Sequence, residues 1–175
     1  MLRYLFPDEE QISVYQMDFC RFYYMGYRGI IFDIDNTLVP HGNMADQQAK
    51  ELFCRLHGEG FQTILLSNNK EPRVKSFSED VHSGYIYKAG KPGTRNYRKA
   101  MELMGVDKKT TMFVGDQIFT DVFGAKKAGI YTVLVRPINP REEIQIVLKR
   151  YLEAVVLFFY HKKSRKEKMH HGKSD

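Results

Sequence analysis

Short apolar runs that stop abruptly at polar residues alternate along this chain with segments of helical character. The apolar runs lie at residues 29–32, 62–66, 84–87, 111–114 and 131–135. The helical segments lie at residues 46–57, 72–80, 94–104 and 120–128, and from residue 139 onward. When strands alternate with helices, each helix returns the chain to the same edge of the sheet, so the strands pair in parallel. The pattern therefore predicts an α/β fold, with a parallel sheet and helices on both of its faces.

Two acids follow the first apolar run. Asp33 ends the run, Asp35 lies two residues later, and Thr37 follows. Because parallel sheets present reactive groups at the carboxyl ends of their strands, we expect both carboxylates at one rim of the fold. Such a pair can bind a divalent cation and can also attack phosphorus. Taken alone, the same stretch fits equally well a strand that ends in an Asp-rich turn.

Further polar residues lie at or near the expected ends of the later strands. In chain order they are Ser67 with Asn68, Lys91, Asp116 and Asp121. Taken singly, Ser67 and Lys91 would match a turn serine and a surface lysine. In the same way, Asp116 and Asp121 would match a helix cap and an acid of the first helical turn. Their order behind Asp33 and Asp35 favours a common site.

The ordered set resembles the four motifs of the haloacid dehalogenase (HAD) superfamily. These motifs are an Asp-x-Asp-x-Thr loop, a Ser or Thr after the second strand, a Lys, and a Gly-Asp loop with a second Asp; all four lie within residues 29–121. A closer resemblance is to the YqeG group of class III (IIIA) phosphatases, related to phosphatidylglycerophosphate phosphatases. It rests on Asp-Ile-Asp-Asn-Thr-Leu-Val-Pro, Leu-Ser-Asn-Asn, Gly-Lys-Pro and Gly-Asp-Gln-Ile-Phe-Thr-Asp. The resemblance implies a three-layer, Rossmann-like HAD core.

The resemblance also implies a role for each acid. Asp33 would attack phosphorus and become an aspartyl phosphate. Asp35 would protonate the leaving oxygen and then, as a carboxylate, deprotonate the attacking water. Mg²⁺ would be bound by Asp33, Asp116 and the backbone carbonyl of Asp35, and Asp121 would orient the water ligands of the metal. An acid at position 35 favours a phosphatase or a phosphomutase, because P-type ATPases of the superfamily carry Thr there. Hydrolysis of the aspartyl phosphate by water favours the phosphatase, since no large cap shields the site.

The same resemblance implies that residues of the second and third motifs bind the phosphate. Ser67 would donate a hydrogen bond to a phosphate oxygen, helped by the backbone N–H of Asn68. Lys91 would neutralise both Asp33 and the phosphoryl group as a point charge. Lys88 lies three residues earlier and is a rival for this role, but Lys91 directly precedes Pro92 and matches the motif better.

The spacing between motifs leaves no room for a cap domain, the insertion that covers the site in many HAD enzymes. Thr37 and Ser67 are separated by 29 residues, and Ser67 and Lys91 by 23. One helix and one strand use most of each gap. We therefore expect an open site that admits bulky substrates. A lipid phosphate such as phosphatidylglycerophosphate is the favoured substrate, and a soluble sugar or nucleotide phosphate is the alternative.

Composition sets the remaining expectations. The chain has 175 residues, of which 43% are hydrophobic, so residues 1–160 suit a single HAD-like domain. Residues 161–175 carry six basic and two acidic residues, a net +4 of the chain's +6, and are read as a disordered basic tail. This tail could instead contact anionic lipid or RNA. A non-catalytic RNA- or ribosome-binding module is therefore a second alternative, although nucleic acid is the less favoured partner.

Location and assembly follow from the ends of the chain. No stretch of membrane-spanning length is apolar, and the acidic N-terminal segment does not resemble a secretory signal. We therefore expect a cytoplasmic protein. A peripheral contact with a membrane is the further option. The final helix, capped by Asn139 and reaching residue 160, is read as packed on the sheet; the alternative is an interfacial helix. The same choice arises for a cluster of N-terminal aromatic residues, for which we favour the core: Phe19, Phe22, Tyr23, Tyr24 and Tyr27. Either apolar surface could also pair two subunits.

Overall fold

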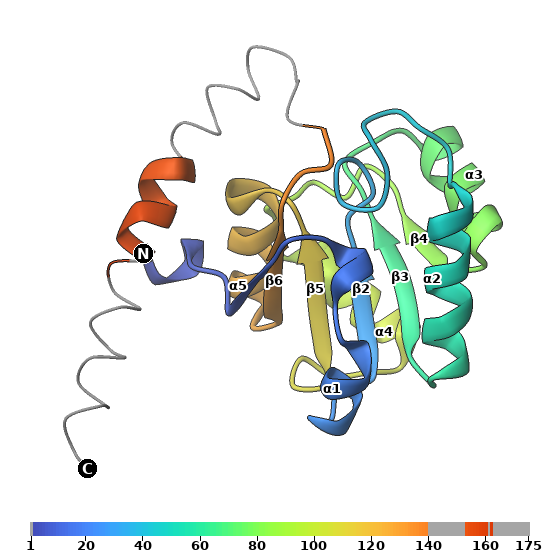
Figure 1. Ribbon diagram of the computed structural model, residues 1–175, viewed down its shortest axis with the longest axis horizontal. Coiled ribbons are helices and arrows are strands. Elements are labelled where there is room, and N and C mark those ends of the chain that lie inside the picture. The colour runs from blue at the N-terminus through green and yellow to red at the C-terminus, as the bar shows by residue number, and fades with distance from the viewer. Residues whose placement is uncertain (1, 140–152, 161, 163–175) are drawn as a thin grey trace.

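A six-stranded parallel sheet forms the centre of the protein (Figure 1). The structure is a computed structural model and describes residues 2–139, 153–160 and 162. The strand order is β1-β6-β5-β2-β3-β4, and every pairing is parallel. The strands are β1 (Glu9–Gln11), β2 (Gly29–Phe32), β3 (Gln62–Leu66), β4 (Gly84–Ile86), β5 (Thr111–Gly115) and β6 (Tyr131–Val135). Because β2 lies between β3 and β5, the first acidic motif stands at the middle of the sheet.

Helices cover both faces of this sheet, which confirms the predicted α/β fold. They are α1 (Phe19–Tyr24), α2 (Gln47–Gly58), α3 (Glu71–Val81), α4 (Arg95–Met104) and α5 (Phe123–Ala128). Residues of α1, α2 and α3 pack against one face around Phe32, Leu65 and Val114. Residues of α4 and α5 pack against the other face around Ile31 and Phe113. Alternate residues of the central strands thus serve two cores, which explains why these strands are apolar throughout.

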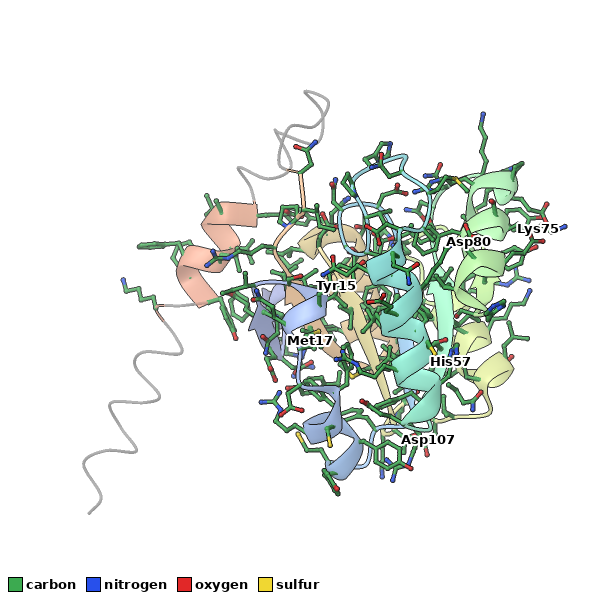
Figure 2. The ribbon with its side chains drawn as sticks, turned by 45° about the vertical axis from the view of Figure 1, so that its right-hand side comes forward. Tyr15, Met17, His57, Lys75, Asp80 and Asp107 are labelled. Atoms are coloured by element: carbon green, nitrogen blue, oxygen red, sulfur yellow. The ribbon has the colours of Figure 1, made fainter. Side chains whose placement is uncertain are left out.

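The crossover helices begin and end largely where the sequence predicts. Asp46 caps α2 by accepting a hydrogen bond of 2.8 Å from the Ala49 N–H. Gly105 and Gly129 end α4 and α5 in the left-handed conformation that glycine adopts easily. Thr94 can cap a helix by its sequence and does occupy the position before α4, but its side chain makes no capping hydrogen bond. The outer surface of α3 carries charged side chains such as Lys75 (Figure 2).

Two elements differ from the sequence-based expectation. β1 is short and polar, and its pairing with β6 extends the sheet by a strand that the apolar pattern does not reveal. The helix expected over residues 120–128 begins earlier, with the π-helical turn η3 (Ile118–Val122), and becomes the α-helix α5 only at Phe123. In this turn the Val122 N–H bonds to the Gln117 carbonyl, one residue further back than in an α-helix.

Most of the N-terminal aromatic cluster belongs to the core. Phe19 and Phe22 are buried, Tyr23 and Tyr27 pack against the same cluster, and only Tyr24 projects from α1, with 85% of its surface exposed. The core interpretation of these aromatics is therefore correct for four of the five residues. Two 3₁₀ turns, η1 (Leu2–Leu5) and η2 (Val14–Gln16), flank β1 and complete this end of the fold.

Residues 153–160 form a helix beside η1 (Figure 1). Val156 and Leu157 pack with Ile118, Val122 and Leu134, and the rings of Phe6 and Tyr160 lie 5.6 Å apart. Asn139, the expected first residue of this helix, is described, but the expected continuation through Ile144, Leu148, Tyr151 and Leu152 lies in residues 140–152, outside the described part. The basic residues from 163 onward lie outside it as well. None of the described helices is long and apolar enough to span a bilayer.

Candidate active site

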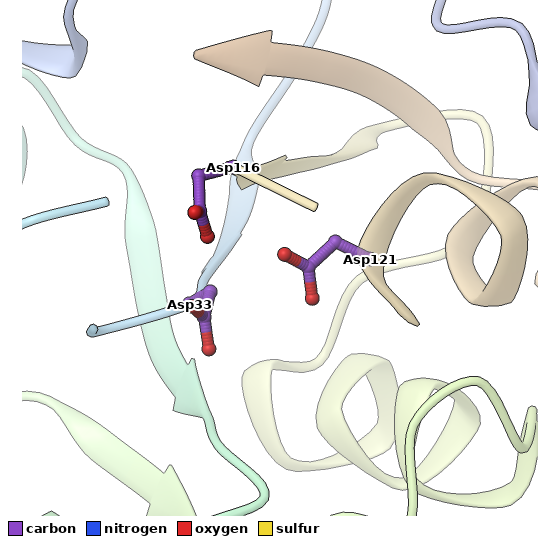
Figure 3. A group of neighbouring side chains, drawn as sticks. All are labelled: Asp33, Asp116 and Asp121. Atoms are coloured by element: carbon purple, nitrogen blue, oxygen red, sulfur yellow. The ribbon is translucent and has the colours of Figure 1, made fainter. Parts of the chain in front are cut away.

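The carboxyl ends of β2 and β5 bring together acids from distant parts of the chain. Phe32 pairs with Val114, and the Asp33 N–H continues the ladder by donating to the Val114 carbonyl at 3.0 Å. Asp116 follows β5, and Asp121 lies in η3. Carboxylate oxygens of Asp33, Asp116 and Asp121 lie within 4.8 Å of one another, and Figure 3 shows the three side chains converging. All three are buried.

Lys91 completes this cluster. Its Nζ lies 2.6 Å from Asp33 Oδ1 and 2.7 Å from Asp121 Oδ1, and its side chain is only 4% exposed. The Asn68 side chain holds the Lys91 backbone on both sides: Oδ1 accepts from the Lys91 N–H at 2.9 Å, and Nδ2 donates to the Lys91 carbonyl at 3.3 Å. The rival Lys88 is exposed. Lys91 is therefore the lysine that reaches the acids.

The charges of the cluster do not cancel, since three carboxylates face one ammonium group. Burial raises the pKa of Asp33 to about 7, and the nearby Asp121 and Asp35 act in the same direction, while Lys91 opposes them. Burial alone would lower the pKa of Lys91, but Asp121 and Asp33 outweigh it and raise that pKa above its usual value. Another positive charge among these acids would therefore be favourable.

A tight turn aims the first motif into the site. Asn36 has a φ of 62°, a left-handed conformation that Asn tolerates better than most residues. Its N–H donates to the Val39 carbonyl at 2.7 Å, and the Leu38 N–H donates to the Ile34 carbonyl at 2.9 Å. Thr37, the last residue of the motif, donates to Asp116 Oδ1 at 3.5 Å. The turn thus connects the β2 acids to the β5 acid directly.

Close packing fixes the position of Asp121. A Cβ atom on Gly115 would lie 2.6 Å from Asp121 Oδ2, so the carboxylate occupies the space that any larger residue would need. The same oxygen accepts a hydrogen bond of 3.1 Å from the Gln117 N–H. The Tyr97 hydroxyl, from α4, donates to the carbonyls of Thr120 and Asp121 at 3.0 and 3.3 Å. Packing against Gly115 and hydrogen bonds from Gln117 and Tyr97 therefore fix Asp121, the second acid of the Gly-Asp motif.

Asp35 has a different environment, because it points toward α3. Its carboxylate accepts hydrogen bonds from the Gly42 N–H at 2.9 Å, from Asn69 Nδ2 at 2.9 Å and from Arg73 Nη2 at 3.1 Å. Burial by itself would raise the pKa of Asp35, but these three hydrogen bonds and the Arg73 charge together lower it. Asp33 and Asp35, two residues apart, thus have pKa values shifted in opposite directions.

A cavity of about 240 Å³ opens above the acids. Its lining includes Asp33, Asp35, Ser67, Asn68 and Lys91. The Ser67 hydroxyl accepts a hydrogen bond of 3.2 Å from the Asn69 N–H, which leaves its own proton for donation to a ligand. The structure therefore brings every residue of the four motifs to one place. Roles in phosphate binding are consistent with this placement of Ser67, Asn68 and Lys91.

The donor set fits a hard divalent cation. Asp33, Asp116 and Asp121 offer oxygen ligands only, and Mg²⁺ prefers few protein carboxylates with retained waters. Burial is the main cause of the raised pKa of Asp33, and the neighbouring Asp121 and Asp35 add to it against the opposing charge of Lys91, so a further cation beside Asp33 would be favoured. The residues present therefore suit Mg²⁺, which Asp33 and Asp116 would bind, with Asp121 near enough to orient its water ligands.

Several residues of the site were not anticipated from the sequence. Arg73 and Asn69 contact Asp35, His41 and Thr120 line the cavity, and Tyr97 braces η3. Asn69 directly follows the Ser-Asn motif, and this adjacency is a signal that could have revealed it. Arg73 carries no such signal, because only the packing of α3 brings it to Asp35.

Comparisons with known proteins agree with this geometry. Residues 43–129 match the family model of the haloacid dehalogenase-like hydrolases. The chain is 32% identical over 156 residues to the probable phosphatase YqeG of Bacillus subtilis, covering 89% of this chain and 91% of that protein. It is 25% identical over 167 residues to the phosphatidylglycerophosphate phosphatase 1 of Arabidopsis thaliana, covering 86% of this chain and 46% of that protein, so the chain spans less than half of that relative.

Solved structures share the fold. The cobalt-bound deoxy-D-mannose-octulosonate 8-phosphate phosphatase YrbI of Haemophilus influenzae superposes with a TM-score of 0.53 at 15% identity, over 79% of this chain and 92% of that one. At this identity the likeness concerns the fold alone. The shared architecture, the family model and the similarity to YqeG over nearly the whole length lead to one conclusion: the chain belongs to the haloacid dehalogenase-like hydrolases and is a phosphatase of that family.

Proposed function

We propose that the protein is a Mg²⁺-dependent phosphomonoester hydrolase that acts through an aspartyl-phosphate intermediate on Asp33. The observation that carries the proposal is the buried cluster in which Lys91 bridges Asp33 and Asp121 beside Asp116. A buried carboxylate with a raised pKa is costly to maintain, and such groups concentrate at functional sites. Asp33 and Lys91 of this cluster line a cavity of about 240 Å³, which is large enough for a phosphoryl group.

Each residue has a task that its contacts support. Mg²⁺ bound by Asp33, Asp116 and the Asp35 carbonyl would neutralise the repulsion between a phosphate dianion and the acids. Asp33 attacks phosphorus, the phosphorus–oxygen bond to the leaving group breaks, and the phosphoryl group moves to the Asp33 carboxylate. Ser67 and Lys91 hold phosphoryl oxygens, and Asp121 keeps Lys91 in place through the ion pair of 2.7 Å.

Asp35 serves both half-reactions. It first protonates the leaving oxygen and, as a carboxylate, then removes a proton from the water that cleaves the aspartyl phosphate. The hydrogen bonds from Gly42, Asn69 and Arg73 favour the carboxylate form, which suits the second half-reaction. Approach of a substrate phosphate would add negative charge beside Asp35. This charge favours the protonated form of Asp35, which the first half-reaction needs.

The substrate that we propose is a lipid phosphate monoester such as phosphatidylglycerophosphate. The open site supports this substrate. Between Thr37 and Ser67 the only described helix and strand are α2 and β3. Between Ser67 and Lys91 they are α3 and β4. No cap domain stands over the cavity within these described segments. The similarity to the Arabidopsis phosphatidylglycerophosphate phosphatase supports the same substrate class.

The decisive experiment is an assay of the purified protein with Mg²⁺ against phosphorylated lipids, sugars and nucleotides. We expect turnover of a lipid phosphate, loss of activity in EDTA, and no activity in Asp33→Asn or Asp35→Asn at unchanged folding. Activity confined to soluble sugar or nucleotide phosphates would exclude the lipid substrate. If the wild-type protein hydrolysed no phosphate ester, the catalytic proposal itself would fail, and an RNA- or ribosome-binding role would then become the better explanation.

A further inference from the structure

After Glu153, the helix at residues 153–160 consists of apolar and aromatic residues on all sides, but it is buried on only one. Its inner side packs Val156 and Leu157 against the cluster of η3, β6 and η1. Its outer side presents Val155, Phe158 and Phe159, which are 55%, 63% and 56% exposed. The two phenylalanine rings lie edge to face, with centroids 5.6 Å apart. These three residues, called here the outer face, form one contiguous apolar surface.

The outer face is unusual among the exposed apolar residues of the protein. Val155, Phe158 and Phe159 are spaced by three and four residues, so they lie on one side of the helix. Other strongly exposed apolar side chains, such as Tyr24 and Leu103, project from separate helices. Scattered single residues of that kind are normal on soluble proteins, whereas a grouped aromatic surface marks an interaction site.

The sequence next to this helix indicates what the outer face binds. Lys162, Lys163, Arg165, Lys166 and Lys168 follow within a few positions, with Glu167 as the one acid among them. A second copy of the chain would bring an equally positive segment to the same contact, and the two would repel. An anionic lipid surface attracts the basic residues and accepts aromatic side chains at its headgroup level.

We propose that the outer face inserts into the interface of an anionic lipid bilayer, to which the basic sequence after the helix adds electrostatic attraction. The described part of the helix, residues 153–160, is not long enough to span a bilayer, and in this proposal it lies along the membrane surface. Its inner side is fixed to the phosphatase domain, and Glu153 at its first described position accepts a hydrogen bond of 2.9 Å from the Ile118 N–H of η3. Docking would therefore hold the bilayer beside the element that carries Asp121.

The test uses the absence of tryptophan from the chain. In Phe159→Trp the single indole reports directly on the outer face, and Leu103→Trp, from an equally exposed position on α4, is the matched control. On vesicles of phosphatidylcholine mixed with phosphatidylglycerol we expect a blue shift of the indole emission in Phe159→Trp and none in Leu103→Trp. Salt should weaken the effect, as should vesicles of pure phosphatidylcholine. An unshifted emission of Phe159→Trp on anionic vesicles would overturn the proposal.

A binding measurement complements the fluorescence. We expect Phe158→Ser/Phe159→Ser to lower sedimentation with the same anionic vesicles by about tenfold or more, because two aromatic side chains no longer transfer from water. Leu103→Ser should bind like the wild type, and thermal melting checks that each variant is folded. Equal vesicle binding by the double variant and the wild type would contradict the inference. If the wild type were a dimer and the double variant a monomer, while both bound vesicles equally, a second copy of the chain would be the partner that covers the outer face. Neither readout requires turnover, so both remain informative if the proposed phosphatase substrate is wrong.

Discussion

The Lys91 ammonium group lies 2.7 Å from the Asp121 carboxylate, and both side chains are almost fully buried, with exposures of 4% and 1%. Neither residue belongs to a strand, yet the pair joins the segment after β4 to the turn after β5. Because Lys91 also contacts Asp33, the pair determines how much negative charge surrounds the nucleophile. Substitutions at Lys91 and at the residues around it should therefore have effects that can be told apart by experiment.

Replacing Lys91 by Met should abolish turnover and destabilise the metal-free protein. The change leaves buried carboxylates without their partner, which typically costs about 3–5 kcal/mol of unfolding free energy. Lys88→Met is the matched control, because Lys88 is exposed and three residues away; its effect should stay within about 0.5 kcal/mol. Urea unfolding in EDTA measures both. Equal damage from the two substitutions would show that Lys91 has no special place in the site.

The stability of the metal-free protein should fall between about pH 4 and pH 7 through Asp33. Burial raises its folded-state pKa from 3.8 to about 7, so folding favours the protonated acid. This contribution is fully present below pH 3.8 and is lost as the pH rises through 7. Asp33→Asn cannot ionise, so its Tm in EDTA should exceed that of the wild type increasingly from about pH 5 to about pH 8, by at least several degrees. Mg²⁺ should reduce this difference. A difference that is independent of pH would mean that Asp33 is not protonated in this range.

Substituting Arg73 by Ala should move the acidic limb of the kcat profile to higher pH. Arg73 donates to Asp35 at 3.1 Å and is one of the groups that lower the pKa of Asp35. Without it, the carboxylate that deprotonates water would form only at higher pH. Lys75→Ala is the control on the same helix, since Lys75 points outward from α3 (Figure 2). If Arg73→Ala lowered kcat equally at every pH, its role would be structural rather than electrostatic.

Glu153→Leu should loosen η3, the element that carries Asp121, and lower turnover. The substitution leaves the buried Ile118 N–H without its acceptor, at a cost of about 1–3 kcal/mol. Glu153→Gln keeps an oxygen in the same place and should retain most of the activity. Melting temperature and kcat of the two variants should therefore change together. Equal turnover by Glu153→Leu and the wild type would show that η3 does not need this support.

The parts of the fold and site that the sequence predicts correctly are those set by local patterns. The central strands are apolar throughout because both faces are buried, and the acids lie directly after them. Once β2 and β5 are assigned as neighbours, Asp33 and Asp116 must meet at one rim. The choice of Lys91 over Lys88 followed from the neighbouring proline, and the buried position of Lys91 agrees with it.

The rest depends on packing that a linear pattern does not encode. β1 is three polar residues at the edge of the sheet, where the burial that would make it recognisable is lacking. Arg73 reaches Asp35 because of the orientation of α3, and any of several cations nearby in sequence could have done so. Glu153 looks like a surface acid in an apolar helix. It is buried nevertheless, and it accepts a hydrogen bond from the Ile118 N–H of η3, which the sequence pattern does not reveal.

Gly115 shows how the site constrains residues that take no part in chemistry. It has no side chain, yet a methyl group there would collide with the Asp121 carboxylate. Any replacement would thus displace the partner of Lys91 and act as though the ion pair itself had been altered. A saturation screen of this chain should therefore rank position 115 among its least tolerant positions. Its result would resemble that of a catalytic residue, although Gly115 contributes only the absence of a side chain.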